Sequence, residues 1–344
     1  MRAVQFNGPG DVSVVDRPDP AIVESTDAIV RVVATCVCGS DLWPYRGETE
    51  RAAGSPIGHE FVGTVEEAGS DVTGVHPGDF VIAPFQWSDN TCANCVHGFS
   101  SVCMHGGGWD SATGGGQGEL VRTPQADGTL VVVPGGRPDD SMIASLLSLS
   151  DVFPTGHHAA VSARVTPGTT VAVVGDGAVG LSGVLAAQRL GAGRIIAFSR
   201  HADRQELARR FGATDIIASR GEDAVAELLD RTSGVGADAT LECVGTGQSM
   251  TTAFGVARAG SVVGFVGVPH GVNVPVNVMF RRNVGLVGGV APARSYANDL
   301  LPDVMSGAVN PGLVFDHQVT LETLPDGYRA MDERRAIKAW AIVS

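Results

Sequence analysis

The sequence predicts a two-domain α/β protein, in which a mostly antiparallel β domain precedes a doubly wound parallel-sheet domain. Three observations support this prediction. The length of 344 residues suits about two domains. Short strand-like segments separated by Gly, Pro and Asp occupy residues 1–150, and from about residue 165 apolar runs alternate with helical stretches. Such alternation builds a parallel sheet with crossover helices.

The first domain is expected to contain short strands joined by turns. Its strand-like segments are rich in β-branched and aromatic residues and end at turn-forming residues. They cover residues 2–6, 27–36, 60–69, 79–85 and 130–134.

The second domain is expected to repeat a strand and a helix. The predicted strands cover residues 170–175, 194–199, 214–219, 237–245 and 261–267, and the predicted helices cover residues 178–190, 202–212, 223–232 and 250–260. The pattern changes near residue 290, after which a helix is expected around Asp299–Ser306 and a last strand near Lys338–Val343. The expected domains are residues 1–152 and 153–290, with residues 291–344 returning to the first domain.

Composition excludes several classes of partner. The net charge of -13 disfavours binding to a nucleic-acid backbone or an anionic membrane, since either would repel the chain. No apolar run approaches the roughly 20 residues of a transmembrane helix, and residues 1–18 alternate like a strand rather than a signal peptide. A soluble, cytoplasmic protein that acts on small molecules is expected.

A glycine motif stands between the first strand and the first helix of the second domain. The segment VAVVGDGAVG has the G-x-G-x-x-G spacing of dinucleotide-binding loops, in which the glycines allow a tight turn and close approach of a pyrophosphate to a helix N-terminus. The predicted cofactor-binding residues are Gly175, Gly177, Ala178, Val179 and Gly180.

The end of the next strand favours NADP over NAD. An NAD site usually has an Asp or Glu there for the ribose 2′-hydroxyl, whereas this strand is followed by Ser199 and Arg200. A hydroxyl and a guanidinium suit a 2′-phosphate, and Arg204 is a further candidate. Alternatively, the two arginines only form the solvated start of a helix.

Three of the six cysteines mark a candidate structural zinc site. Cysteines clustered in a reducing compartment indicate a metal site rather than a disulfide framework. Four ligands within fifteen residues would close a tetrahedral site: Asp89, Cys92, Cys95 and Cys103. His97 competes with Asp89 as the fourth ligand, and a redox disulfide between Cys92 and Cys95 is the other alternative.

Three separate residues form a candidate catalytic zinc site. Cys38 and His59 each have a carboxylate nearby in sequence, Asp41 and Glu60 respectively, and Asp151 is a lone carboxylate in an apolar stretch. A thiolate, an imidazole and a carboxylate with one open position suit catalytic zinc. Taken singly, each residue also fits a purely structural role.

Together these motifs resemble the zinc-dependent medium-chain dehydrogenase/reductase family, of the alcohol dehydrogenase type, over essentially the whole chain. The matching segments occur in the family's order: CGSD at 38, GHE at 58, residues 89–103, Asp151, VGDGAVG at 174 and VGV at 266. The resemblance implies a GroES-like catalytic domain, a Rossmann NADP-binding domain and an enzyme that interconverts an alcohol and an aldehyde or ketone. It also implies a homodimer or homotetramer, and the apolar run 284–290 is a candidate for pairing between subunits.

The resemblance also assigns residue roles. Cys38, His59 and Asp151 would hold the catalytic zinc, with Glu60 as a nearby or exchanging ligand, and Ser40 would pass on the proton. Trp43 stands where the family often continues this proton relay with a histidine, so the proton needs another route. Asp89 stands where the family usually has a cysteine. The nucleotide is expected to contact Cys243, Val266, Gly267 and Val268, and the aromatic candidates for the substrate pocket are Phe85, Trp43 and Trp109.

Two rival functions remain open at this point. A zinc-free quinone or enone reductase of the same superfamily would keep the nucleotide domain and lack the zinc ligands. A non-catalytic NADP-binding protein would keep the glycine motif and need no open zinc site.

Overall fold

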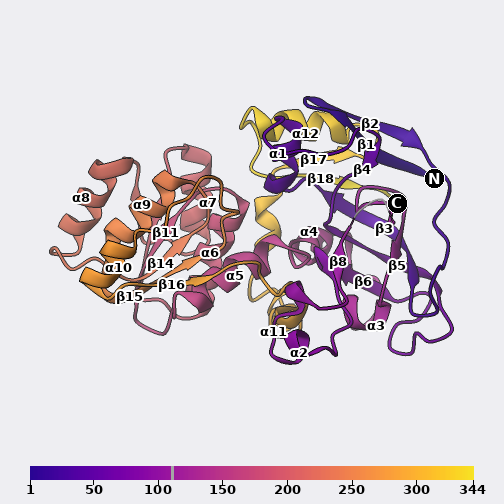
Figure 1. Ribbon diagram of the computed structural model, residues 1–344, viewed down its shortest axis with the longest axis horizontal. Helices are drawn as coiled ribbons and strands as arrows, with labels where there is room; N and C mark the ends of the chain where they lie inside the picture. Colours follow the sequence, from indigo (N-terminus) through magenta and orange to yellow (C-terminus); the bar gives the residue numbers. More distant parts are fainter. Residues whose placement is uncertain (110–111) are drawn as a thin grey trace. The chain divides into compact units, whose positions relative to one another are not determined.

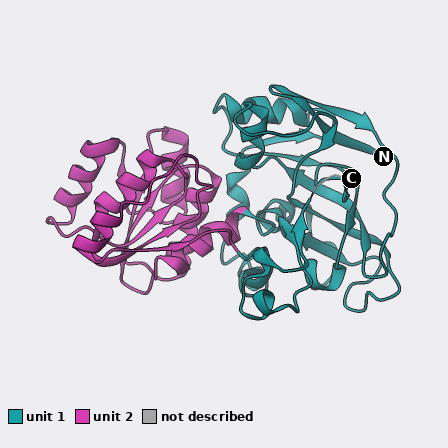
Figure 2. Cartoon of the chain, in the orientation of Figure 1, with its two compact units in different colours: residues 1–151, 292–344 teal, residues 152–291 magenta. Residues whose placement is uncertain are grey.

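The computed structural model describes residues 1–109 and 112–344. The chain folds into two compact units, shown in different colours in Figure 2. Unit 1 contains residues 1–151 and 292–344, and unit 2 contains residues 152–291. The predicted fold class is confirmed, since unit 1 is mostly antiparallel β structure and unit 2 has a parallel sheet.

Unit 1 is built around a mixed sheet in which β3 is the central strand. The strand order is β10-β6-β5-β3-β18-β17, and β9 also pairs with β3. All pairs are antiparallel except β17 with β18. These strands are β3 (Ala28–Cys36), β5 (Phe61–Ala68), β6 (Phe80–Ala83), β9 (Leu120–Thr123), β10 (Val131–Val132), β17 (His317–Thr320) and β18 (Ala339–Ile342).

Smaller elements complete unit 1. Two further sheets have the orders β2-β1-β4 and β7-β8. Their strands are β1 (Arg2–Gly8), β2 (Asp11–Asp16), β4 (Ser55–Pro56), β7 (Gln86–Trp87) and β8 (Gly107–Gly108). The helices of unit 1 are η1 (Gly39–Asp41), α1 (Leu42–Tyr45), α2 (Ala93–Val96), η2 (Ser100–Val102), α3 (Ala126–Thr129), α4 (Asp140–Ser148), α11 (Ala293–Met305), η3 (Pro311–Val314) and α12 (Leu324–Asp332).

Helix α11 begins six residues before the predicted Asp299. Its buried face starts with Ala293 and Ala297 and continues through Leu300, Leu301 and Val304 at helical spacing. The first turns were missed because their buried side chains are small alanines, which give a weak apolar signal.

Unit 2 is a Rossmann fold. Its strands are all parallel, in the order β13-β12-β11-β14-β15-β16, which is the 3-2-1-4-5-6 order of dinucleotide-binding sheets when counted within the unit. Figure 1 shows the helices around this sheet. The elements are α5 (Val152–Ser162), β11 (Thr170–Val174), α6 (Ala178–Arg189), β12 (Arg194–Phe198), α7 (Ala202–Arg210), β13 (Asp215–Ile217), α8 (Gly221–Arg231), β14 (Ala237–Glu242), α9 (Gly247–Val256), β15 (Ala257–Phe265), α10 (Val276–Arg282) and β16 (Gly285–Gly288).

Helix α8 illustrates how the local sequence forms this fold. Ala224 and Leu228, four residues apart, are its buried residues. Glu222 and Asp223 lie in the first turn and Arg231 in the last, where their charges complement the helix dipole.

Among the described residues, each helix is too short or too polar to span a lipid bilayer.

Candidate functional site

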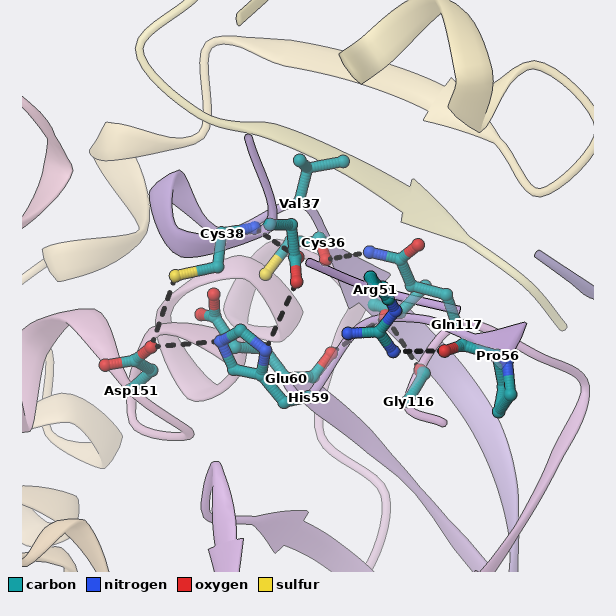
Figure 3. A network of polar contacts seen from close by, with 12 residues as sticks. Cys36, Val37, Cys38, Arg51, Pro56, His59, Glu60, Gly116, Gln117 and Asp151 are labelled. Atoms are coloured by element: carbon teal, nitrogen blue, oxygen red, sulfur yellow. Dashed lines mark hydrogen bonds and ion pairs between the residues drawn. The ribbon is translucent and has the colours of Figure 1, made fainter. Parts of the chain in front are cut away.

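The predicted catalytic cluster is assembled from separate segments of unit 1. Cys38 follows β3, the pair His59 and Glu60 precedes β5, and Asp151 follows α4. Each residue offers one ligand atom, and all four of these atoms lie within 4.8 Å of one another. Figure 3 shows Cys38, His59, Glu60 and Asp151 converging from different parts of the fold.

The spacing of the donor atoms suits a zinc ion. Asp151 Oδ2 lies 3.5 Å from Cys38 Sγ and 3.5 Å from His59 Nε2. In a tetrahedral zinc site, bonds of roughly 2.0 to 2.3 Å place a thiolate and an oxygen about 3.5 Å apart and an imidazole nitrogen and an oxygen about 3.3 Å apart. The donor set of sulfur, nitrogen and oxygen therefore fits zinc in both chemistry and size.

The electrostatics of this cluster also favour a cation. Burial would lower the pKa of His59, but the neighbouring Asp41 and Cys38 raise it well above its ordinary value. Burial raises the pKa of Cys38, and the charge of Asp151 raises it further. The site thus gathers negative groups in a buried place, and a divalent cation would stabilise both the thiolate and the carboxylates.

Asp41 orients the imidazole ring of His59 through the ring nitrogen Nδ1. Its Oδ1 lies 3.4 Å from His59 Nδ1, while its Oδ2 accepts a hydrogen bond from the Cys38 amide at 3.0 Å. A carboxylate on the second ring nitrogen fixes the ring orientation and the tautomer of a metal-binding histidine. The sequence pattern placed this carboxylate near Cys38, and the structure adds its contact with His59.

Glu60 is held by a buried lysine that sequence reasoning missed. Lys338 Nζ lies 2.7 Å from Glu60 Oε1 and donates to the Val37 carbonyl at 3.1 Å. Glu60 is 0% and Lys338 1% exposed. The other oxygen, Glu60 Oε2, is buried without a hydrogen-bond partner among the described residues. One carboxylate oxygen is thus fixed, and the other remains available as a ligand.

The proposed proton and pocket residues have different environments. Ser40 lies half-buried in η1 and Trp43 half-buried in α1. The ring of Phe85 packs edge-on against His59, with 6.4 Å between ring centroids, so it borders the candidate metal cluster. Trp109 is instead part of the hydrophobic core, where it packs on Phe61 and donates to a backbone carbonyl.

The second predicted cluster is formed by one loop that carries α2 and η2. Cys92 Sγ lies 3.6 Å from Cys95 Sγ and 3.8 Å from Cys103 Sγ, and Asp89 Oδ1 lies 3.2 Å from Cys103 Sγ. Two thiolates on a tetrahedral zinc are about 3.8 Å apart. The cysteines are free thiols, and His97 bonds the Ala93 carbonyl and is not one of the four clustered residues.

The groups around Asp89 keep it anionic. Burial would raise the pKa of Asp89, but the amides of Thr91 and Cys92 and the side chain of His105 hold it well below its usual value. His105 Nδ1 lies 2.6 Å from Asp89 Oδ2, whereas Asp89 Oδ1 lies near Cys103 Sγ and also accepts hydrogen bonds from the amides of Thr91 and Cys92. Sequence reasoning did not assign His105, because no metal motif includes it.

The glycine motif lies at the carboxyl edge of the unit 2 sheet, between β11 and α6. A Cβ on Gly180 would lie 2.1 Å from the Gly175 carbonyl oxygen, so the helix packs tightly on the turn. Gly175 has a φ of +122°, and a Cβ on Gly177 would meet no atom within 4 Å. The backbone around Gly177, Ala178 and Val179 at the start of α6 is thus open to a pyrophosphate.

Two neighbouring loops face the same edge. A Cβ on Gly267 would lie 2.1 Å from the Gly245 amide, so the segments 243–245 and 266–268 pack backbone to backbone. Cys243 follows β14 and Val266 and Val268 follow β15, next to the point where the strand order reverses. This is the region where open parallel sheets bind their ligands.

The residues expected to hold a 2′-phosphate are partly engaged by a carboxylate. Ser199 Oγ donates to Asp176 Oδ2 at 2.7 Å, and Arg204 forms an ion pair with Asp176 Oδ1 at 3.5 Å. Arg200 is exposed. Sequence reasoning looked for an acidic residue only on the strand and missed Asp176 in the glycine turn.

Comparisons with known proteins agree with this architecture. Residues 24–135 match the model of the alcohol dehydrogenase GroES-like domain, and residues 178–304 match that of the zinc-binding dehydrogenases. A zinc-type alcohol dehydrogenase B of Aspergillus flavus is 33% identical, with 98% of this chain and 80% of the relative covered. A probable zinc-binding alcohol dehydrogenase of Mycobacterium tuberculosis is 34% identical, with 95% of this chain and 84% of the relative covered.

A solved structure is similar over the full length. An alcohol dehydrogenase from Thermus sp. ATN1 superposes with a TM-score of 0.92 at 32% identity, covering 100% of both chains.

Proposed function

The chain belongs to the zinc-dependent medium-chain dehydrogenase/reductase family, and from this premise we propose that it is an NADP-preferring enzyme that interconverts an alcohol and an aldehyde or ketone. The observation that carries the proposal is the convergence of the donor atoms of Cys38, His59 and Asp151. In this proposal residues 153–290 bind the nucleotide, and residues 1–152 with 291–344 hold zinc and substrate.

The metal ligands leave a position for substrate. When bound, zinc supplies a Lewis acid for the substrate oxygen, and the nicotinamide carries the hydride. Cys38, His59 and Asp151 would hold the ion, Asp41 would keep the His59 ring in place, and Glu60 would serve as an exchanging ligand. Phe85 lies against His59 and would exclude water from the reacting carbon.

Ser40 is the proposed acceptor of the hydroxyl proton. Its Oγ would accept the proton that leaves the substrate hydroxyl during oxidation while it gives up its own hydroxyl proton, and the two transfers would run in reverse during reduction. Because Trp43 cannot carry a proton onward, we propose that the proton leaves through water or a ribose hydroxyl of the cofactor.

The nucleotide preference rests on the charge beside β12. Arg200 is exposed and makes no ion pair with a described residue, so its guanidinium remains available for a 2′-phosphate. Gly175, Gly177 and Gly180 would place the pyrophosphate at the start of α6, and the segments at Cys243 and at residues 266–268 would border the rest of the cofactor.

A second zinc is proposed for the loop that carries Asp89, Cys92, Cys95 and Cys103. This ion would be structural, since four protein ligands leave no position for substrate. Zinc analysis of freshly purified protein is expected to give two ions per chain, and one ion per chain would contradict this assignment.

The proposed assembly is a homo-oligomer in the cytoplasm. Strand β16 is the edge of the unit 2 sheet, and Val287 on this strand and Phe280 on α10 are 45% and 84% exposed. An exposed apolar edge strand favours pairing with a second copy. The free cysteines suit a reducing compartment. Size measurement by light scattering would test the assembly, and a monomer would contradict it.

The first experiment is to follow reduced nicotinamide absorbance with NADPH and with NADH, against aldehydes and ketones of graded size, before and after chelation of zinc. The proposal predicts turnover that favours NADPH and is lost with the metal. Turnover that resists chelation would instead identify a zinc-free reductase. Nucleotide binding without turnover on any alcohol or carbonyl compound would identify a non-catalytic NADP-binding protein.

A further inference from the structure

The carboxylate of Asp176 lies at the carboxyl edge of two adjacent parallel strands. Strands β11 and β12 pair with Val174 opposite Phe198, so the residues that follow them emerge side by side. Asp176 belongs to the turn after β11, and Ser199 directly follows β12. The adenosine ribose of a dinucleotide lies at this edge, beyond the end of the second strand.

The hydrogen bond from Ser199 determines what this hydroxyl offers to a ligand. Ser199 is buried, and its Oγ has two acceptors within reach, Asp176 Oδ2 at 2.7 Å and the His201 carbonyl at 3.5 Å, so that its single proton is donated to the nearer Asp176. A hydroxyl that has given its proton can only accept a further hydrogen bond. A ribose 2′-hydroxyl can donate to this oxygen, whereas a 2′-phosphate needs donors.

The same carboxylate neutralises one of the two arginines. Arg204 Nη1 lies 3.5 Å from Asp176 Oδ1 and donates to the Asp176 carbonyl at 3.3 Å. The Arg204 side chain is 12% exposed and that of Asp176 25% exposed, so the pair is largely shielded from solvent. Of the two guanidinium groups near Ser199, only that of Arg200 is left without an acidic partner among the described residues.

We propose that Asp176 is a specificity-determining residue of the dinucleotide site, whose carboxylate favours a 2′-hydroxyl and opposes a 2′-phosphate on the adenosine ribose. This inference rests on the proposed function, since it concerns the same nucleotide site. It assigns the preference for NADP to Arg200 and limits that preference through Asp176. A carboxylate from the glycine turn thus takes the place of the acidic residue that is absent from the strand end.

The test compares binding of 2′,5′-ADP and 5′-AMP, two fragments that differ only in the 2′-phosphate and do not need the metal site. Dissociation constants are measured by calorimetry on the full zinc-loaded chain. For Asp176→Asn, which keeps the shape and removes the charge, we expect preference for 2′,5′-ADP to rise about tenfold, the order expected for loss of a like charge a few ångströms away. The preference is the ratio of the two dissociation constants measured on one protein sample. A misfolded fraction lowers binding of both fragments equally and therefore does not change this ratio.

Asp203→Asn is the matched control. Asp203 is exposed in the first turn of α7, so this variant changes the net charge by the same amount without touching Ser199. The preference should stay within about twofold of the native value, because a charge in open solvent is screened. In Asp176→Ala, which also frees the Ser199 proton, the preference should rise at least as far as in Asp176→Asn.

Two results would overturn the inference: an unchanged preference in Asp176→Asn, or a fall, which would mean that Asp176 holds Arg204 in place for the phosphate. Failure of the proposed function looks different. In that case the native chain binds neither fragment, or Arg200→Ala leaves its affinity for 2′,5′-ADP unchanged.

Discussion

The two candidate metal clusters of unit 1 are similar in chemistry and opposite in construction. The cluster at Cys38 joins residues as far apart in sequence as Cys38 and Asp151, which are separated by 113 positions. The cluster at Cys92 spans only 14 positions, from Asp89 to Cys103. Cys38 and Asp151 are buried, whereas Asp89, Cys92 and Cys103 remain partly exposed.

This difference indicates that the fold determines the first site, whereas the metal would determine the local fold at the second. The strands and helices of unit 1 bring the first cluster together, so that the fold positions the ion. The second cluster lies in a loop with only short helical turns, α2 and η2, so that the ion would position the chain. We therefore expect the first cluster to affect chemistry most and the second to affect local order most.

The largest expected effect is the loss of turnover in Cys38→Ala. Removing this ligand should lower kcat/KM by about a thousandfold or more, since the Lewis acid contributes several kcal/mol to the transition state. Cys95→Ala, the matched variant in the loop cluster, should also lose one zinc but retain turnover within about tenfold, while residues 93–104 become sensitive to protease. If folded Cys95→Ala is inactive, the two sites do not act separately.

The second prediction concerns the fold that supports the first cluster. Lys338→Met leaves the Glu60 carboxylate buried without its cation, and removal of one partner of a buried pair costs about 3–5 kcal/mol of unfolding free energy. Urea unfolding of the zinc-loaded protein measures this loss. The double variant Lys338→Met/Glu60→Gln should recover part of it, because the uncompensated charge is gone. A single variant as stable as the native protein would show that the pair does not support the cluster.

The third prediction concerns His105, whose ring contacts Asp89 in the loop cluster. His105→Ala removes the partner of Asp89 Oδ2 and should weaken zinc binding in the loop by about 10–100-fold. Competition with a chromogenic chelator should show one of the two ions released more readily and the other unchanged. Equal weakening of zinc binding at both sites, or unchanged binding at both, would contradict the role given to His105.

The smallest expected effect is a difference in thiol reactivity after the metal is removed. The Met104 amide, followed by that of Cys95, lowers the pKa of Cys92 to about 7, whereas burial raises the pKa of Cys38. The thiolate is the reactive form, so alkylation of Cys92 by iodoacetamide should rise about fivefold from about pH 6 to about pH 7 and about twofold more at higher pH before it levels off. Cys38 should react only at higher pH, and peptide mass spectrometry that finds Cys38 modified first would contradict this.

The sequence predicted those features that short segments encode. The glycine turn at Gly175–Gly180 and the cysteines at 92, 95 and 103 each lie within one stretch, so their spacing alone carries the chemistry. The predicted fold class and family are confirmed. The ligand roles of Cys38, His59, Glu60, Asp151 and the Asp89 cluster stay predictions.

Contacts between distant residues could not be predicted. Lys338 and Glu60 are separated by 278 positions, and no local pattern around Lys338, which directly precedes β18, indicates that this lysine is buried against a carboxylate. Asp176 and Ser199 are 23 positions apart and meet only because β11 and β12 are neighbours in register. The choice between NAD and NADP depends on such contacts, and for this reason the strand-end rule alone is incomplete.

The position of β18 has a consequence for how the chain is made. This strand lies between β3 and β17, yet residues 339–342 follow the whole of unit 2 in the sequence. During synthesis the edge of β3 at residues 34–36 therefore stays unpaired until β18 has emerged, whereas unit 2 is one continuous segment and can fold earlier. A nascent chain that has just completed unit 2 exposes an open strand edge, which is the surface that chaperones must protect from aggregation.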